Sequence, residues 1–360
     1  MPYSLDDKLV VGITSRALFH LDAANDVYVT DGLAAYRAYQ QQHEDVPLAP
    51  GTAFPLVRGL LGINEKGKGR LVEVIVISRN DADSGIRIFN SIEHHKLDVT
   101  RGAFTDGRDA AAYLGAFHCD LFLSAELDDV KHALEKRCPA ALVLPPPDED
   151  EKDSAGEVRV AFDGDAVLFD EESERVFQNE GLDAFLAREA QLAGTPMNPG
   201  PFEPFLRGLK LVQDHFPEED SPIRTALVTA RNAPAHKRVV NTLRHWGVRI
   251  DETYFLGGIE KARVLAVFRP HIFFDDQMAH LRSAQVHTPS ALVPPIVEQI
   301  PLPFAAPLDG TAVTHDRDSS ASISLQLPQE VIDAARAGGS KTQNQRGETD
   351  SDTRSRELPA

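Results

Sequence analysis

The chain has 360 residues, enough for two domains of ordinary size, and its 42% hydrophobic and 26% charged residues are typical of a soluble globular protein. The formal net charge of −18 argues against nucleic acid and anionic membranes as partners, because binding to phosphate backbones needs a basic surface. Two cysteines are too few for a disulfide framework and indicate a reducing compartment, and no run reaches 18 apolar residues, so we expect neither secretion nor a membrane span.

Short apolar runs alternate with helical stretches along the first part of the chain. We expect strands at residues 9–13, 71–77, 121–124 and 141–144, and helices at residues 31–42, 53–61, 86–95 and 128–136. Short buried strands separated by helices are typical of crossover units, which build a parallel sheet with helices on both faces. The sequence therefore predicts an α/β fold.

The same alternation returns after a break rich in proline and acidic residues. Strands are expected at residues 158–162, 225–229 and 272–274, and helices near residues 171–179, 182–192, 202–215 and 235–246. The break predicts a linker at 145–157 between a first domain, 1–144, and a second domain, 158–300. The polar composition after residue 300 predicts a disordered tail, 301–360.

The two parts read as copies of each other. A shift of 149 positions lays residues 10–60 on residues 159–209 without a gap, and Gly32 then falls on Gly181. The differences concern the polar residues with phosphate chemistry: Asp163 and Asp165 face Thr14 and Arg16, Thr229 faces Ile77, Lys261 faces Ala110, and Asp275 faces Ser124. We therefore expect a tandem duplication of a Rossmann-like domain in which only the second copy is catalytic.

An Asp-Gly-Asp sequence directly follows the apolar run at 158–162. Ligands bind at the carboxyl ends of the strands of a parallel sheet, so both carboxylates are expected at a site. Asp163 is suited to nucleophilic attack on phosphorus, and Asp165 to protonating the leaving alkoxide and then activating water. Gly164 allows the backbone to approach phosphoryl oxygens closely. A plain Asp-Gly turn after a strand is the structural alternative.

Further polar residues follow the next apolar runs in chain order. Thr229 ends one run and can donate a hydrogen bond to phosphate, and Lys261 supplies a positive charge for it. Asp275 and Asp276 end another run. Hard cations such as Mg²⁺ prefer carboxylate oxygens, so we expect a magnesium site among four acids: Asp163, Asp165, Asp275 and Asp276. Taken singly, each residue has a structural alternative as a strand-end, helix-surface or turn residue.

These four motifs resemble those of the haloacid dehalogenase-like superfamily. The segments Phe-Asp-Gly-Asp-Ala-Val-Leu-Phe at 162–169, Thr-Ala-Arg at 229–231 and Phe-Phe-Asp-Asp-Gln at 273–277 are similar to the cytosolic 5′-nucleotidase I family, over roughly residues 8–297. The resemblance implies Mg²⁺-dependent hydrolysis of nucleoside 5′-monophosphates, AMP prominent among them, in the cytoplasm. It implies the same roles for Asp163, Asp165, Thr229, Lys261 and Asp275, and leaves open whether Asp275 or Asp276 binds the metal directly.

The interval between the first two motifs is longer than one crossover needs. We therefore expect residues 171–215 to form a helical cap over the pocket. Candidates for nucleoside contact are Ala230, Arg231, Arg16, Arg79 and Asn80. Two other functions stay open, a phosphatase acting on another small phosphate ester and a nucleotide-sensing protein with vestigial catalysis. The sequence leaves base preference, effectors and homo-oligomer formation undecided.

Overall fold

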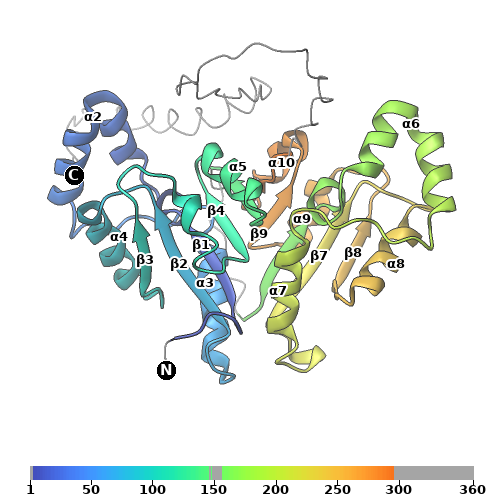
Figure 1. Ribbon diagram of the computed structural model, residues 1–360, viewed down its shortest axis with the longest axis horizontal. Coiled ribbons are helices and arrows are strands. Elements are labelled where there is room, and N and C mark those ends of the chain that lie inside the picture. The colour runs from blue at the N-terminus through green and yellow to red at the C-terminus, as the bar shows by residue number, and fades with distance from the viewer. Residues whose placement is uncertain (1–2, 146, 148–155, 296–360) are drawn as a thin grey trace, which may run out of the picture. The chain divides into compact units, whose positions relative to one another are not determined.

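The computed structural model describes residues 3–145, 147 and 156–295, in which strands and helices alternate (Figure 1). The elements of the first half are β1 (Leu9–Ile13), α1 (Ser15–Leu18), α2 (Asp22–Gln42), α3 (Phe54–Gly62), η1 (Ile63–Lys66), β2 (Val72–Ser78), α4 (Ala82–His94), β3 (Arg101–Phe104), η2 (Ala110–Tyr113), β4 (Leu121–Ser124), α5 (Leu127–Glu135) and β5 (Ala140–Val143). The predicted tail, and most of the predicted linker, lie outside the described residues.

The second half repeats this order. Its elements are β6 (Val158–Phe162), η3 (Gly164–Leu168), α6 (Glu172–Gln191), α7 (Glu203–Gln213), η4 (Glu218–Asp220), β7 (Ile223–Thr229), α8 (His236–Trp246), β8 (Glu252–Phe255), α9 (Lys261–Phe268), β9 (Ile272–Asp275), α10 (Met278–Ala284) and β10 (Ser290–Leu292). All seven strands predicted from apolar runs are present, with bounds that differ by at most two residues. The α/β fold class is therefore confirmed.

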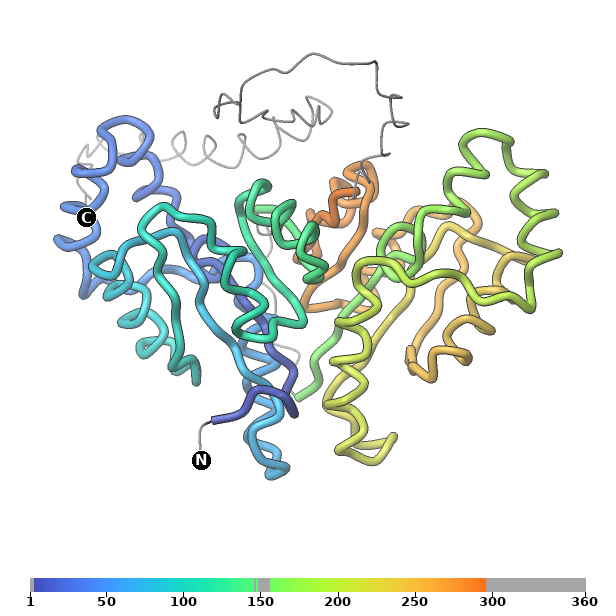
Figure 2. The backbone as a smooth tube through the Cα atoms, in the orientation of Figure 1, coloured from blue at the N-terminus to red at the C-terminus, as the bar shows by residue number. Residues whose placement is uncertain are grey.

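All ten strands belong to one sheet, in the order β3-β2-β1-β4-β5-β10-β9-β6-β7-β8. Each half contributes five parallel strands in matching order, and the halves meet where Ala291 of β10 pairs antiparallel with Val143 of β5. Figure 2 shows the first half, in blue to green, on one side of this junction and the yellow-green part of the second half on the other. The continuous sheet was not predicted, because two short buried strands carry no signal for which partner they choose. The duplication itself stays a prediction, as does the division into separate domains.

Helices α3 and α7 pack across the junction in equivalent ways. The Cα of Gly208 on α7 lies so close to Leu9 of β1 that a Cβ there would be 2.8 Å from Leu9 Cδ1, and a Cβ on Gly59 of α3 would be 3.1 Å from Val158 Cγ2 of β6. Gly59 and Gly208 are themselves equivalent under the shift of 149 positions. Each helix thus buries part of its surface against the first strand of the other half, which ties the two halves into one core.

Three strands, β3, β8 and β10, were not predicted, and several helices differ from the sequence-based expectation. β3 and β8 lie at the two ends of the sheet and are only partly buried, so they lack the apolar runs that mark the other strands. The segment predicted as two helices, near 171–179 and 182–192, is the single element α6, which bends at Gly181. Gly181 has φ 82° and ψ −179°, a backbone conformation that is essentially restricted to glycine. Gly32 bends α2 with the same geometry.

We expect Gly181→Ala to lower the free energy of unfolding by about 1–3 kcal/mol, because alanine is strained at this φ and ψ. The open space around Gly181 rules out a steric contribution, since no atom lies within 4 Å of a Cβ built there. Gly62→Ala is the matched control, because Gly62 has φ −60° and equally open surroundings. Urea unfolding of both variants measures the difference, and equal stability would show that the bend of α6 carries no strain.

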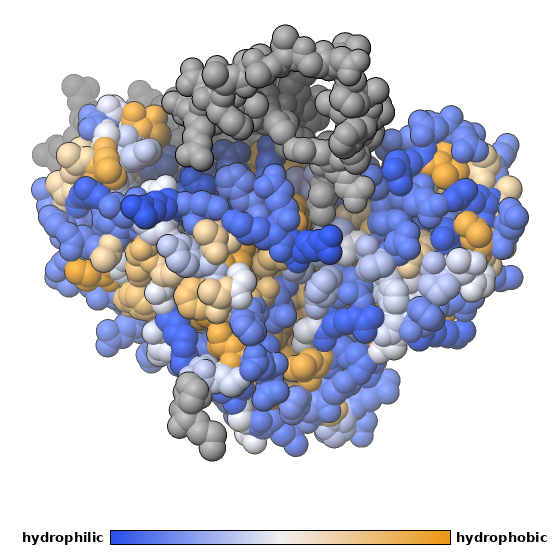
Figure 3. Space-filling model, in the orientation of Figure 1, coloured by the Kyte–Doolittle hydropathy of each residue, from blue (hydrophilic) through white to orange (hydrophobic). Residues whose placement is uncertain are grey.

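The face shown in Figure 3 is mostly hydrophilic, with small apolar patches between the polar side chains. Scattered apolar residues of this kind are normal on protein surfaces. None of the described helices combines the length and the apolar character that a membrane crossing requires.

Candidate active site

Three of the predicted site residues lie at the ends of three adjacent strands. Asp163 directly follows β6, Thr229 ends β7 and Asp275 ends β9, and β6 lies between the other two strands in the sheet. All three strands are parallel, so their carboxyl ends open at the same edge (Figure 1). The strands themselves are almost entirely apolar and buried, which fixes where the polar residues after them emerge.

Lys261 joins two of these residues. It is the first residue of α9 and is 3% exposed, and its Nζ lies 2.8 Å from Asp163 Oδ1 and 2.7 Å from Asp275 Oδ2. Burial alone would lower the pKa of Lys261, but the two adjacent carboxylates hold it above its ordinary value. The structure therefore brings Asp163, Lys261 and Asp275 together as one charged cluster with a fixed positive charge at its centre.

This cluster has more negative charge than Lys261 balances. Burial and the neighbouring carboxylates raise the pKa of Asp163, although Lys261 opposes the shift. Burial, with Asp163 and Asp275 nearby, also raises the pKa of Asp276 to about 8, and the buried Oδ1 of Asp276 has no hydrogen-bond partner among the described residues. Burial and the mutual repulsion of the carboxylates thus favour their neutral forms, and Lys261 offsets only part of this effect.

The donor atoms fit a hard divalent cation. Single ligand atoms of Asp163, Asp275 and His280 lie within 4.8 Å of one another, and the unpartnered oxygen of Asp276 comes from the same strand end. Carboxylate oxygens are the ligands that Mg²⁺ prefers. His280 was not among the predicted residues. Its Nδ1 lies 3.2 Å from both carboxylate oxygens of Asp275 because α10 begins three residues after the strand ends, a turn length that the sequence does not reveal.

Asp165 lies in a different network from the candidate metal ligands. Its Oδ2 accepts a hydrogen bond from Arg231 Nε at 2.8 Å, and its Oδ1 accepts one from Arg231 Nη2 at 2.5 Å. Both carboxylate oxygens are thus engaged by one guanidinium group. The sequence predicted Asp165 as a fourth acid of the metal site, but its carboxylate is not in the group of candidate ligand atoms formed by Asp163, Asp275 and His280.

Arg231 is held in turn by a buried glutamate of α6. Its Nη1 lies 2.5 Å from Oε2 of Glu189, which is 0% exposed, and the other oxygen of Glu189 accepts a hydrogen bond from Arg238 at 2.8 Å. Although burial opposes it, the pKa of Arg231 is raised by Asp165 and Glu189, so this guanidinium remains charged. Arg231 had been predicted as a nucleoside contact, whereas its polar atoms here are engaged by protein carboxylates. Glu189 was missed because it lies far from every motif in sequence.

Comparison with known proteins agrees with this arrangement. A family described as 5′-nucleotidase matches residues 1–299. Cytosolic 5′-nucleotidase 1B from Homo sapiens is 37% identical over 291 residues, which cover 77% of this chain and 47% of the human protein. The chain belongs to the 5′-nucleotidase family. The similarity to cytosolic 5′-nucleotidase 1B confirms the resemblance seen in the motifs, and the chain spans about half the length of that relative. No solved structure shows a significant match.

Thr229 and its neighbours form the remaining side of the site in this member of the 5′-nucleotidase family. The Thr229 hydroxyl accepts a hydrogen bond from the backbone N–H of Arg231 at 3.2 Å, which leaves its own proton for a ligand. A Cβ on Gly164 would be 3.4 Å from this hydroxyl, so Gly164 and Thr229 are neighbours. Ala230, which follows the strand end, is exposed.

The first-half residues predicted as nucleoside contacts lie elsewhere. Four strands separate β1 from β6, which places the two strands about 24 Å apart at a spacing of about 4.8 Å per strand. Arg16 pairs with Glu126, Arg79 with Asp129 at 2.5 Å, and the amide of Asn80 donates to Ser15 at 3.1 Å. The structure therefore does not bring Arg16, Arg79 and Asn80 to Asp163.

The structure also corrects one predicted equivalence between the halves. β2 and β7 each have seven residues and pair in the same register with β1 and β6, so the final residue of β2, Ser78, corresponds to Thr229. The sequence comparison had paired Ile77 with Thr229, one residue too early. The number of positions that separates equivalent residues of the two halves changes before this strand, and the sequence alone does not show by how much. The first half thus keeps a hydroxyl at this strand end and lacks the lysine and the acids.

Proposed function

We propose that this protein is a Mg²⁺-dependent 5′-nucleotidase that hydrolyses AMP-like nucleoside 5′-monophosphates to nucleoside and phosphate in the cytoplasm. The observation that carries the proposal is the cluster of Asp163, Asp275 and Lys261 at adjacent strand ends, with Thr229 beside it. Membership of the 5′-nucleotidase family supports the reaction, and the similarity to cytosolic 5′-nucleotidase 1B supports the substrate class and the compartment.

In this mechanism Asp163 attacks the phosphorus atom of the substrate. The bond from phosphorus to the 5′ oxygen breaks as an aspartyl-phosphate forms, and Asp165 gives its proton to the departing nucleoside oxygen. Asp165 then takes a proton from water, which attacks the phosphorus and releases phosphate, and Asp163 is regenerated. Lys261 and Thr229 bind the phosphoryl oxygens throughout. Asp163 and Asp275, with Asp276 or His280, would hold Mg²⁺, which would supply the positive charge that the carboxylates and the phosphate dianion need.

Within this mechanism we assign Arg231 and Glu189 the task of positioning Asp165. The guanidinium that binds both oxygens of Asp165 holds this carboxylate in place in its ionised form, and Glu189 fixes the guanidinium. Asp165 has to turn away from Arg231 and take up a proton before it protonates the leaving oxygen. The first half provides an internal comparison, because it has Gln40 where Glu189 stands and, by the strand register, Asn80 where Arg231 stands. Its Arg87 still donates to Gln40 at 3.0 Å, so the fold tolerates an amide at this buried position.

Glu189→Gln should therefore lower kcat about tenfold or more while the KM for AMP and for Mg²⁺ changes little, because the variant loosens Arg231 without touching substrate groups. Steady-state kinetics measure kcat and KM, and thermal unfolding of the same preparation measures the melting temperature. Glu180→Gln, an exposed position on the same helix, is the matched control. A lower melting temperature with an unchanged kcat would assign Glu189 a structural task only.

Helix α6 is proposed as the cap that selects the substrate, since Glu189 links α6 directly to the site. Helix α7, which completes the predicted interval 171–215, packs on the sheet against β1 instead. Phosphate release from a panel of 5′-monophosphates and sugar phosphates, with and without Mg²⁺, tests the function. Preference for a sugar phosphate would favour the alternative of another small phosphate ester. Binding of nucleotide without turnover would favour vestigial catalysis, against which the complete set of charged groups argues.

A further inference from the structure

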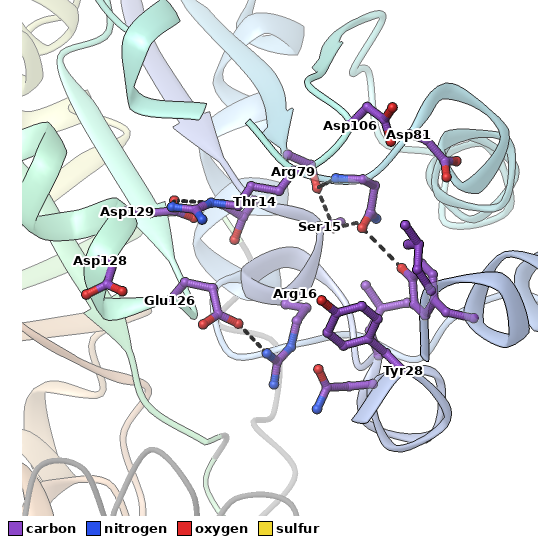
Figure 4. A pocket seen from close by; sticks show the side chains of 17 residues that line it. Thr14, Ser15, Arg16, Tyr28, Arg79, Asp81, Asp106, Glu126, Asp128 and Asp129 are labelled. Carbon is purple, nitrogen blue, oxygen red and sulfur yellow. Dashed lines mark hydrogen bonds and ion pairs between the residues drawn. The ribbon is translucent and has the colours of Figure 1, made fainter. Parts of the chain in front are cut away.

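A pocket of about 400 Å³ opens in the first half, where the catalytic residues are missing (Figure 4). It lies at the carboxyl ends of β1 and β2 and at the start of α5. In the strand order of this half, β2 and β4 lie on opposite sides of β1, so the pocket is at the point where the order reverses. Such points are the usual ligand sites of parallel α/β sheets.

One buried hydroxyl group of this pocket lacks a hydrogen-bond partner among the described residues. Thr14, which directly follows β1, is 6% exposed, and its hydroxyl has no hydrogen-bond partner among the described residues. Buried polar groups in folded proteins nearly always have a partner, and Thr14 lines the cavity, so a ligand in the pocket is the natural source of one. Thr14 holds the position that Asp163 holds in the second half.

The charges around the pocket are unsuited to a phosphate group. Five acidic residues and two arginines line it; Arg16 pairs with Glu126 and Arg79 with Asp129, and Arg37 pairs with Asp81 and Asp106. Three arginines thus face five acids, and Asp128 has no ion-pair partner among the described residues. Ala110 stands where Lys261 would offer a positive charge. An anionic ligand would therefore meet a negative potential without a free cation, whereas a neutral ligand with hydroxyl groups would find acceptors.

The opposite wall of the pocket is aromatic. Tyr28 of α2 is 50% exposed and packs edge-on against Tyr36 at a ring-centroid distance of 6.0 Å, across the cavity from Asp129 and Glu126 (Figure 4). An exposed tyrosine ring is a surface on which a flat heterocycle stacks. The hydroxyl of Tyr36 donates a hydrogen bond to Asn80, which holds the Tyr36 ring in place behind Tyr28.

We infer that this pocket binds an uncharged nucleoside, the kind of compound that the catalytic half releases. The base would stack on Tyr28, and the sugar hydroxyls would reach Thr14 and the carboxylates. The choice of a nucleoside rests on the proposed function, but the neutral, aromatic and hydroxyl-bearing character of the ligand follows from the pocket itself.

Hydrogen–deuterium exchange of the full-length protein with adenosine locates the binding. We expect protection of peptides covering residues 14–36 and 78–81, and a Kd about tenfold weaker in Tyr28→Ala and in Thr14→Val, since each variant removes one stacking or hydrogen-bonding partner. The kcat/KM for AMP should stay unchanged in both variants. Tyr113→Ala is the matched control, because Tyr113 is a tyrosine of the first half that is 44% exposed and does not line the pocket.

Protection confined to residues 163–191, or an unchanged Kd in Tyr28→Ala, would overturn the inference. The inference would also be overturned if AMP protected the first half from exchange more strongly than adenosine does. This comparison uses the Asp163→Asn variant, which does not consume the AMP. Hydrolysis of AMP without any protection of the first half would leave the proposed function intact and reject this site. Protection of the first half in a protein that hydrolyses no 5′-monophosphate would reject the proposed function and retain the site.

Discussion

Asp163→Asn should reduce turnover of nucleoside 5′-monophosphates by more than about 10³-fold while the protein stays folded, because an amide cannot attack phosphorus and no neighbouring group can replace the nucleophile. Asp163 is 5% exposed and an amide of the same shape opens no cavity. The amide oxygen can still accept from Lys261, which lies 2.8 Å from Asp163 Oδ1. Removal of one carboxylate also relieves repulsion with Asp275, so we expect no loss of thermal stability.

The measurement is phosphate release by the purified variant, with its melting temperature as the check on folding. Asp183→Asn, an exposed position on α6, should retain full activity and controls for the loss of one negative charge. Wild-type protein quenched during turnover should carry phosphate on Asp163, and the variant should not. A soluble Asp163→Asn protein with nearly normal turnover would contradict both the nucleophile and the aspartyl-phosphate.

The sequence predicts the strand-end groups of this site because each follows an apolar run directly. Asp163, Thr229 and Asp275 are recognised from their place after a buried strand, and the structure places those strands side by side. Lys261 is recognised only from its spacing to Asp275, yet it proves to be the residue that links two carboxylates. An apolar run is enough to predict a site residue when that residue directly follows a strand, because the carboxyl ends of parallel strands lie at one edge of the sheet.

The groups that were missed depend on contacts between distant segments. Glu189 looks like any charged residue of an amphipathic helix until α6 packs and buries it against Arg231 and Arg238. Arg16 and Arg79 look like substrate contacts because their position within the first half resembles that of the catalytic residues. Only the joining of the two halves through β5 and β10 shows that they lie several strands away. Pairing of strands across halves is a tertiary choice that no local signal carries.

Removal of divalent metal by EDTA should abolish activity, and Mg²⁺ should restore it, because the site holds more carboxylate charge than Lys261 balances before a phosphate dianion enters. Asp275→Ala should raise the Mg²⁺ concentration needed for half-maximal activity by at least about tenfold or remove activity altogether. Asp275 is 0% exposed and is shared by Lys261 and His280, so no exposed acid can replace it.

Thermal unfolding with increasing Mg²⁺ tests the same residues independently of turnover. A cation that binds only the native state raises the melting temperature in proportion to the logarithm of its concentration above Kd. The wild-type protein and Asp220→Ala, an exposed acidic position, should both show this rise, whereas Asp275→Ala should show little of it. If Asp275→Ala responded to Mg²⁺ like the wild type, Asp275 would not be the direct metal ligand, and that role would pass to Asp276. An active protein that resists EDTA would instead remove the metal from the mechanism, and Lys261 alone would have to balance Asp163, Asp275 and the phosphate.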